Sequence, residues 1–188
     1  MADEDESDDF DKVNKPDEAQ SLDAWRREAN LPAASFAKLH GRAFLLLQRA
    51  GKVRLQTPQR PTKTLASRPG LQTELPPTKY IVFPIRKTER SLIARFYSVG
   101  QTRTNDVVVR DVSVSKFHAF FQDAEDGGFL LQDARSTNGT FVNGDRVPRQ
   151  GQGDPVRVNP GDRIRFGNIE VTFMQADDFR ELLLRVYG

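Results

Sequence analysis

The stretch Asp133-Ala-Arg-Ser-Thr-Asn-Gly-Thr-Phe-Val-Asn-Gly144 decides the fold class of this 188-residue sequence. It contains two Asn-Gly dipeptides, Asn138-Gly139 and Asn143-Gly144, and comparable pairs occur at Gly127-Gly128 and Gly161-Asp162. Such dipeptides supply the positive φ that tight hairpin turns require. We therefore expect several close chain reversals in this half of the sequence.

Short runs rich in β-branched and aromatic residues flank these turns, and no helical repeat separates them. This pattern predicts an all-β domain over 79–175, an antiparallel sandwich or barrel. A short C-terminal helix is predicted over 176–188. The predicted strand runs are Tyr80–Phe83, Leu92–Val99, Val107–Val109, Phe117–Phe121, Phe129–Leu131, Ile164–Phe166 and Ile169–Phe173.

Residues 17–51 have the apolar spacing of helices and predict a helical extension. Leu22, Trp25 and Ala29 share one face, and that helix should end before Pro32. A second helix is predicted to end at Gly51, with an apolar stripe of Phe36, Leu39, Ala43, Phe44, Leu47 and Ala50. Two helices are too few to form a core, so we expect the stripe to dock on the same chain, a second copy or a partner.

The charge is distributed unevenly along the chain, whose net charge is only +2. Residues 1–18 carry nine acidic residues and two lysines, and we expect a disordered acidic tail over 1–16. Residues 52–78 contain five prolines and read as a Pro/Thr-rich basic linker. Residues 52–103 have a net charge of +9.

Several function classes are excluded by composition. The chain has no cysteine and only two histidines, His40 and His118, so no metal site is expected. No Gly-x-Ser-x-Gly elbow, P-loop or dinucleotide fingerprint occurs, so we expect neither an enzyme nor a cofactor. The longest apolar run is far below the roughly 20 residues that span a bilayer, and the acidic N-terminus is unlike a signal peptide. A cytoplasmic protein that does not bind membranes is expected.

Three stretches together resemble the forkhead-associated (FHA) domain, a module that binds phosphothreonine peptides. They are Gly100 to Ala119, with Ser115-x-x-His118; the Ser136 to Gly144 motif; and Gly161-Asp-Arg-Ile-Arg-Phe-Gly167. They follow one another in the family's order and at its spacing. The resemblance implies an FHA/SMAD-like β-sandwich and a protein-interaction function in Ser/Thr-kinase signalling or complex assembly.

The resemblance also implies a site made of loops at one end of the sandwich. By this match the hydroxyls of Ser115 and Thr137 would donate hydrogen bonds to the phosphate, and Lys116 would add a cation beside it. Asn138 would form a hydrogen bond with the peptide backbone next to the phosphothreonine. His118 matches the family's structural histidine, which braces the loops. Gly100, Gly139, Asn143 and Gly144 match motif or turn positions.

The sequence departs from the family at Gly100-Gln101, where the family has Gly-Arg. That arginine is the family's chief charged contact with the phosphopeptide, and Gln101 offers amide hydrogens without charge. The loss of one charge-assisted hydrogen bond costs about 1.5–3 kcal/mol, or about ten- to hundredfold in affinity. Arg103, two residues further along the same loop, is the candidate replacement.

Four hypotheses about partners follow. The leading one is a non-catalytic adaptor that reads phosphothreonine on a protein partner. The alternative is a degenerate FHA scaffold that binds without phosphate, through the sandwich face or the 36–50 helix. A third is nucleic-acid binding by the basic 52–103 segment, which lacks interleaved aromatics and is therefore disfavoured. The fourth is binding of the chain's own phosphorylated linker, at Thr57, Thr62, Thr64, Thr73 or Thr78.

Overall fold

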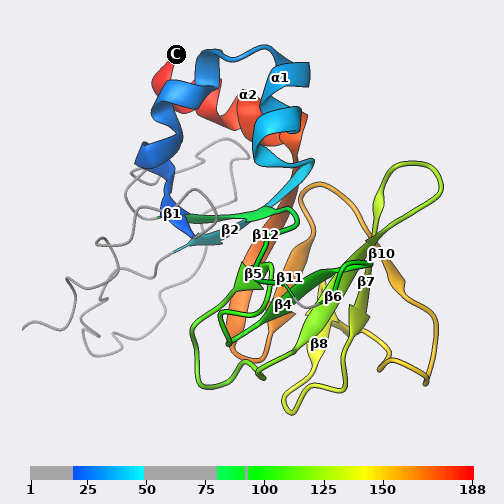
Figure 1. Cartoon of the computed structure of the whole chain (residues 1–188). Coiled ribbons are helices and arrows are strands. Elements are labelled where there is room, and N and C mark those ends of the chain that lie inside the picture. The colour runs from blue at the N-terminus through cyan, green and yellow to red at the C-terminus, as the bar shows by residue number, and fades with distance from the viewer. Residues whose placement is uncertain (1–18, 49–79, 92) are drawn as a thin grey trace, which may run out of the picture.

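Two stacked β-sheets form the body of the protein, with helices gathered at one end (Figure 1). The computed structural model describes residues 19–48, 80–91 and 93–188. The predicted acidic tail at 1–16, the linker at 52–78 and its threonines lie outside these ranges.

The larger sheet has seven strands and the smaller has five. Paired strands are antiparallel in both sheets except β4 and β5, which form a short parallel pair. In spatial order the larger sheet contains β1 (Gln20–Ser21), β3 (Tyr80–Ile85), β2 (Ala43–Gln48), β12 (Ile169–Gln175), β11 (Arg163–Phe166), β8 (Thr140–Val142) and β9 (Asp145–Arg146). The smaller sheet contains β10 (Val156–Val158), β7 (Phe129–Asp133), β6 (Ala119–Asp123), β4 (Tyr97–Gly100) and β5 (Val107–Val108).

An aromatic and aliphatic core fills the space between the sheets. Phe121 and Phe129 from the smaller sheet meet Phe173 from the larger one, with ring centroids 5.8–6.5 Å apart. All three side chains are buried. Inward-facing residues alternate with outward-facing ones along a strand, so each strand adds every second side chain to this core. The predicted antiparallel β-sandwich is confirmed.

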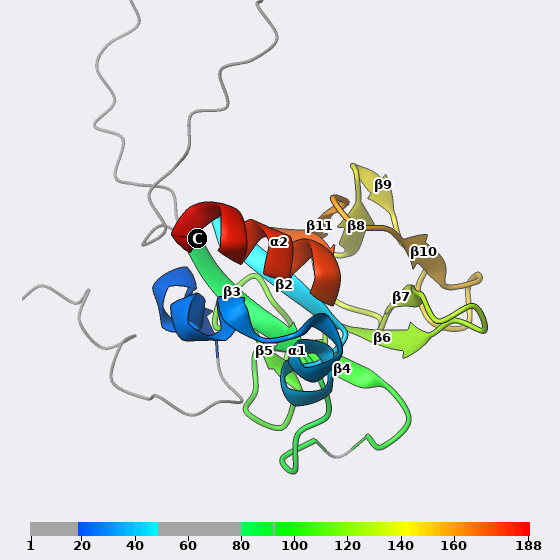
Figure 2. The same ribbon diagram turned by 90° about the horizontal axis from the view of Figure 1, so that it is seen from above.

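A second core lies on the outer face of the larger sheet, beneath three helices. These are a 3₁₀ helix, η1 (Leu22–Asn30), and two α-helices, α1 (Ala33–His40) and α2 (Ala176–Tyr187). They lie over β2 and β3, as Figure 2 shows from above. The predicted face of Leu22, Trp25 and Ala29 is buried there, and the C-terminal helix is confirmed. No helix of the described ranges has the length and apolar character needed to cross a bilayer.

The predicted helix over 36–50 is wrong from Gly41 to Gln48, and its last residues lie outside the described ranges. Gly41, with φ +103°, ends α1, and Ala43–Gln48 forms a strand between β3 and β12. Phe44 faces the helices while Leu45 faces the sandwich core, and both are fully buried. A strand buried on both faces is a continuous apolar run, which periodicity alone does not distinguish from a buried helix. The larger sheet thus includes two strands from before residue 79, β1 and β2.

The helical layer makes a testable contribution to stability. Phe179 of α2 is fully buried, with ring centroids 4.4 Å from Phe44 and 5.5 Å from Trp25. Removal of its ring should leave a cavity and cost about 3–5 kcal/mol of unfolding free energy. We expect Phe179→Ala to lower the urea midpoint accordingly. Val186→Ala, on an exposed part of the same helix, should change the free energy by less than about 0.5 kcal/mol. Equal effects of the two variants would show that the layer does not stabilise the sandwich.

Candidate functional site

The loops that carry the predicted phosphopeptide-binding residues lie at the end of the sandwich opposite the helices (Figure 1). β12 runs from Ile169 directly into α2, so the turn that precedes β12 lies at the far end. Gly167 in this turn donates its N–H to the carbonyl of Gly139, 3.2 Å away. The turn and the Asn138-Gly139 segment are therefore neighbours in space.

The imidazole of His118 joins two of these loops. Its Nδ1 accepts the backbone N–H of Ser115 at 3.0 Å, so Nε2 carries the proton and donates to the carbonyl of Gly139 at 3.1 Å. Burial lowers the pKa of His118, against the opposing effects of the Gly139 hydrogen bond and the nearby Asp133 charge. The ring is therefore a neutral, fully engaged brace.

Asp133 shapes the loop that leads from β7 to β8. Its carboxylate accepts the backbone N–H of Ser136 at 3.0 Å and the hydroxyls of Ser136 and Thr140 at 2.6 and 2.7 Å. The Ser136 oxygen in turn accepts the N–H of Gly139 at 2.9 Å. A buried carboxylate needs this number of donors to offset its desolvation.

Ser115 and Thr137 come together at the tip of the site. The Oγ of Ser115 accepts the backbone N–H of Thr137 at 3.0 Å, and the two hydroxyl oxygens lie 3.4 Å apart. That separation exceeds the 2.7–2.8 Å of a good O–H···O bond. Both hydroxyl protons are therefore available to a stronger acceptor above the pair.

The loop that begins at Gly100-Gln101 is tied to the Ser115 loop. The backbone N–H of Gln101 donates to the carbonyl of Ser115 at 3.0 Å, and Asn105 Nδ2 donates to the carbonyl of Lys116 at 2.7 Å. A side chain at Gly100 would collide with that same Lys116 carbonyl. Glycine at this motif position therefore permits the close approach of the two loops.

Asp106 anchors the other end of the Gly100 loop. It accepts the backbone N–H groups of Thr88 and Ser98 at 2.8 and 2.9 Å and the ammonium of Lys87 at 2.8 Å. Burial would raise the pKa of Asp106, but these donors and Ser91 together hold it below its ordinary value. The carboxylate thus stays ionised. It holds the segment that follows β3 and the start of β4 against the end of the Gly100 loop.

The remaining motif residues divide between the two ends of β8. Asn138 Nδ2 donates to the carbonyl of Ser113 at 2.8 Å, so this side chain lies at the site. Asn143 and Gly144, with φ 52° and 96°, form the turn at the other end of β8. There Asn143 Nδ2 donates to Asp162 at 2.8 Å. They occupy a turn at the end of β8 away from Ser115.

Three predicted binding residues on these loops have polar side chains without a bonding partner in the described ranges. Arg103 and Lys116 are exposed, and Gln101 is half-buried. Within the described ranges, none of their side chains has a hydrogen bond or an ion pair. Their donors are therefore not used by the described part of the protein.

Sequence reasoning missed Arg149. Its guanidinium donates to the carbonyl of Ser136 at 3.2 Å, while Ser115 Oγ accepts the N–H of Thr137 from the other side of the same peptide unit. Arg149 lies beyond the Ser136 to Gly144 motif, and its place in the chain has no signal that connects it to Thr137. Only the return of the chain after β9 brings it to this loop.

The arrangement suits anion binding and does not suit hydrolysis. Both His118 nitrogens are used to hold backbone groups, so the imidazole is not placed to take a proton from Ser115 Oγ. Across the described ranges, no cluster of three or more His, Cys, Asp or Glu side chains forms a candidate metal site. The chemistry on offer is therefore hydroxyl, amide and cationic donors held by a rigid sheet.

One stretch of the chain matches a known protein family. The family model described as FHA domain matches residues 97–167. The chain is 39% identical over 75 residues to the ABC transporter ATP-binding/permease protein Rv1747 of Mycobacterium tuberculosis, which covers 40% of this chain and 8% of that protein. It is 33% identical over 79 residues to the oxoglutarate dehydrogenase inhibitor of Corynebacterium diphtheriae, which covers 42% of this chain and 50% of that protein. The chain thus spans half or less of the length of these relatives.

Among solved structures, the chain is similar to Mycobacterium tuberculosis EmbR in complex with a low affinity phosphopeptide. The identity is 32%, the TM-score is 0.37, and the match covers 44% of this chain and 20% of that one.

The neutral His118 brace predicts a pH dependence of stability. An unfolded histidine titrates near pH 6.5, and burial holds the folded His118 pKa lower. Between these two pH values the unfolded chain binds more protons than the folded chain. The contribution of His118 to the free energy of unfolding should therefore be fully present above about pH 6.5 and decrease as the pH is lowered through that window. Urea unfolding between pH 7.5 and 5.5 measures this slope.

The control for that experiment is the second histidine. His118→Gln should flatten the slope, whereas His40→Gln, which removes a partly buried histidine beside Glu28, should retain it. An unchanged slope in His118→Gln would contradict the role of His118 in the pH dependence.

Proposed function

We propose that this chain, which contains an FHA domain, is a non-catalytic adaptor that binds phosphothreonine-containing protein partners in Ser/Thr-kinase signalling or complex assembly. The single observation that carries the proposal is the pair of hydroxyls at Ser115 and Thr137, 3.4 Å apart on loops from different parts of the chain. The described domain would bind the partner, which is identified here only by its phosphorylated threonine.

A phosphothreonine places three acceptor oxygens and a charge of about −1.5 to −2 on the surface of its partner. Ser115 Oγ uses a lone pair for the Thr137 N–H, and its proton is engaged only in the long 3.4 Å contact with Thr137 Oγ1. Thr137 has an exposed hydroxyl beside it. A phosphate oxygen above both would replace their long mutual contact with two charge-assisted hydrogen bonds.

Cationic and amide donors surround the hydroxyl pair. Lys116 follows Ser115 directly and is exposed, and Arg103 lies on the loop that the Gln101 N–H and Asn105 tie to Ser115 and Lys116. Asn138 donates one amide hydrogen to Ser113, and its amide oxygen remains for a peptide N–H. This is the division of work that phosphopeptide recognition needs: charge at the phosphate and directional bonds at the backbone.

The alternative function is a phosphate-independent scaffold, and Gln101 is the observation that favours it. A guanidinium at this position would supply a fork of charged donors, whereas the amide supplies none with charge. A partner would then bind another part of the surface, and the loop network would serve only to hold the fold.

The two functions are separated by peptide titration into the full chain. We expect a degenerate phosphothreonine library to bind more tightly than its unphosphorylated twin. Thr137→Val removes one donor and should weaken phosphopeptide binding about tenfold or more. Gln101→Arg should strengthen it, because it adds a charged fork beside the phosphate. Ser35→Ala, on the exposed surface of α1, is the matched control and should leave affinity unchanged.

Equal affinity for the two libraries would contradict the proposal. Partner capture that survives both phosphatase treatment and Ser115→Ala would support the scaffold instead.

A further inference from the structure

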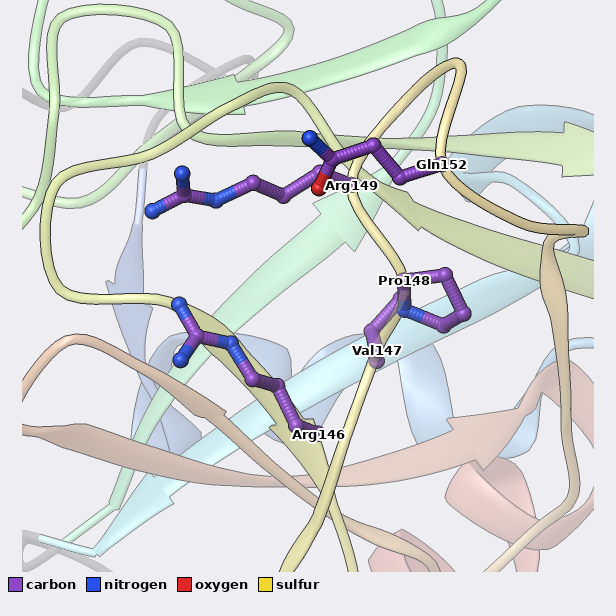
Figure 3. A pocket seen from close by; sticks show the side chains of 5 residues that line it. All are labelled: Arg146, Val147, Pro148, Arg149 and Gln152. Atoms are coloured by element: carbon purple, nitrogen blue, oxygen red, sulfur yellow. The ribbon is translucent and has the colours of Figure 1, made fainter.

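An open pocket of about 430 Å³ lies beside the loop that carries Ser136 and Thr137. Its lining comes from the segment that follows β8, and none of these residues belongs to the predicted site. Figure 3 shows the lining side chains, which are Arg146, Val147, Pro148, Arg149 and Gln152.

Two guanidinium groups of the pocket point toward the β7–β8 connection (Figure 3). Arg149 reaches the carbonyl of Ser136 at 3.2 Å. Arg146 extends to Gly139, where its guanidinium nitrogen would lie 3.3 Å from a Cβ built on that glycine. The two arginines therefore flank the Ser136–Gly139 loop along the side away from Ser115.

The positive charge of these arginines is not neutralised by the protein. Within the described ranges, no carboxylate forms an ion pair with Arg146 or Arg149, and the Nε of Arg149 is buried without a hydrogen-bond partner. The carboxylate of Asp133 is buried and already accepts from Ser136 and Thr140. The buried Nε of Arg149 is closed to solvent and one of its terminal N–H groups is used for the Ser136 carbonyl, so the donors left for an external anion are its other terminal N–H groups and those of the exposed Arg146.

The pocket adjoins the hydroxyl pair through one peptide unit. Arg149 holds the carbonyl of the Ser136–Thr137 peptide, and Ser115 holds its N–H. A peptide whose phosphate sits over Ser115 and Thr137 would extend past this unit, and its neighbouring side chain would reach the pocket. The assignment of the pocket to a bound phosphopeptide therefore rests on the proposed phosphothreonine function.

We infer that the pocket between Arg146 and Arg149 is a subsite for an acidic side chain, aspartate or glutamate, close to the phosphothreonine of the partner. Guanidinium forks match the two oxygens of a carboxylate. Half-buried Pro148 and buried Val147 form an apolar wall that limits the access of water to one side of the ion pair. The subsite also supplies charge on the flank opposite Gln101.

The experiment scans one acidic residue through a phosphothreonine peptide. An alanine-based peptide with a central phosphothreonine receives aspartate, or asparagine as its neutral twin, at each position from −4 to +4. A third arm places a phosphoserine at the preferred position. Affinities are measured with the full wild-type chain and with the variants Arg146→Gln and Arg149→Gln. The control is Arg185→Gln, which removes an equal charge from an exposed position of α2 at the opposite end of the sandwich.

We expect one position at which wild type prefers aspartate over asparagine by about three- to fivefold, the range of a solvent-accessible ion pair. Arg146→Gln should abolish this preference and leave the asparagine peptide unaffected, because Arg146 does not hold the Ser136 carbonyl. Arg185→Gln should keep the preference. Tighter binding of the phosphoserine peptide, also lost in Arg146→Gln, would identify a second phosphate as the natural anion of the same subsite.

Two failures are distinguishable. If phosphothreonine peptides bind but aspartate is preferred nowhere, or the preference persists in Arg146→Gln and Arg149→Gln, the subsite is disproved and the proposed function stands. If no phosphothreonine peptide binds wild type, both are disproved together.

Discussion

The site depends on the placement of one neutral imidazole between two loops. His118 accepts from the Ser115 backbone and donates to the Gly139 carbonyl, so the Ser115 loop and the Ser136–Gly139 loop cannot move independently. Each bond is worth only about 1 kcal/mol net, but an unsatisfied group at either end would be buried, and that cost maintains the contact. The hydroxyls of Ser115 and Thr137 meet because this brace holds the backbone beneath them.

The rest of the fold keeps that end of the sandwich rigid. Phe121, Phe129 and Phe173 pack between the sheets, and the helices cover the outer face of the larger sheet far from the loops. The helical layer therefore supports the strands without covering the candidate site. Asp106 and Asp133 perform the same task at smaller scale, because each carboxylate accepts hydrogen bonds both from a loop and from the start of a neighbouring strand.

The charge around the site is arranged asymmetrically. On the Gln101 flank the loops carry the exposed Arg103 and Lys116, whereas on the other flank Arg146 and Arg149 are held against the loop backbone. A ligand that carries one phosphate and one carboxylate would match this distribution better than a phosphate alone. Specificity would then come from the spacing of two negative groups, since each separate contact is weak.

The sequence by itself determined the β-rich domain and the C-terminal helix, because turn dipeptides, β-rich runs and helical spacing are local signals. The choice of a sandwich over a barrel, and the placing of Ser115 and Thr137 in one site, came from the resemblance of its ordered motifs to a known family. The sequence did not distinguish the buried strand Ala43–Gln48 from a helix, since burial on both faces leaves no period to read. Nor did it reveal Arg149, whose role arises only where the chain after β9 returns to the Ser136 carbonyl. Such contacts join residues that share no sequence pattern, so only the tertiary structure decides them.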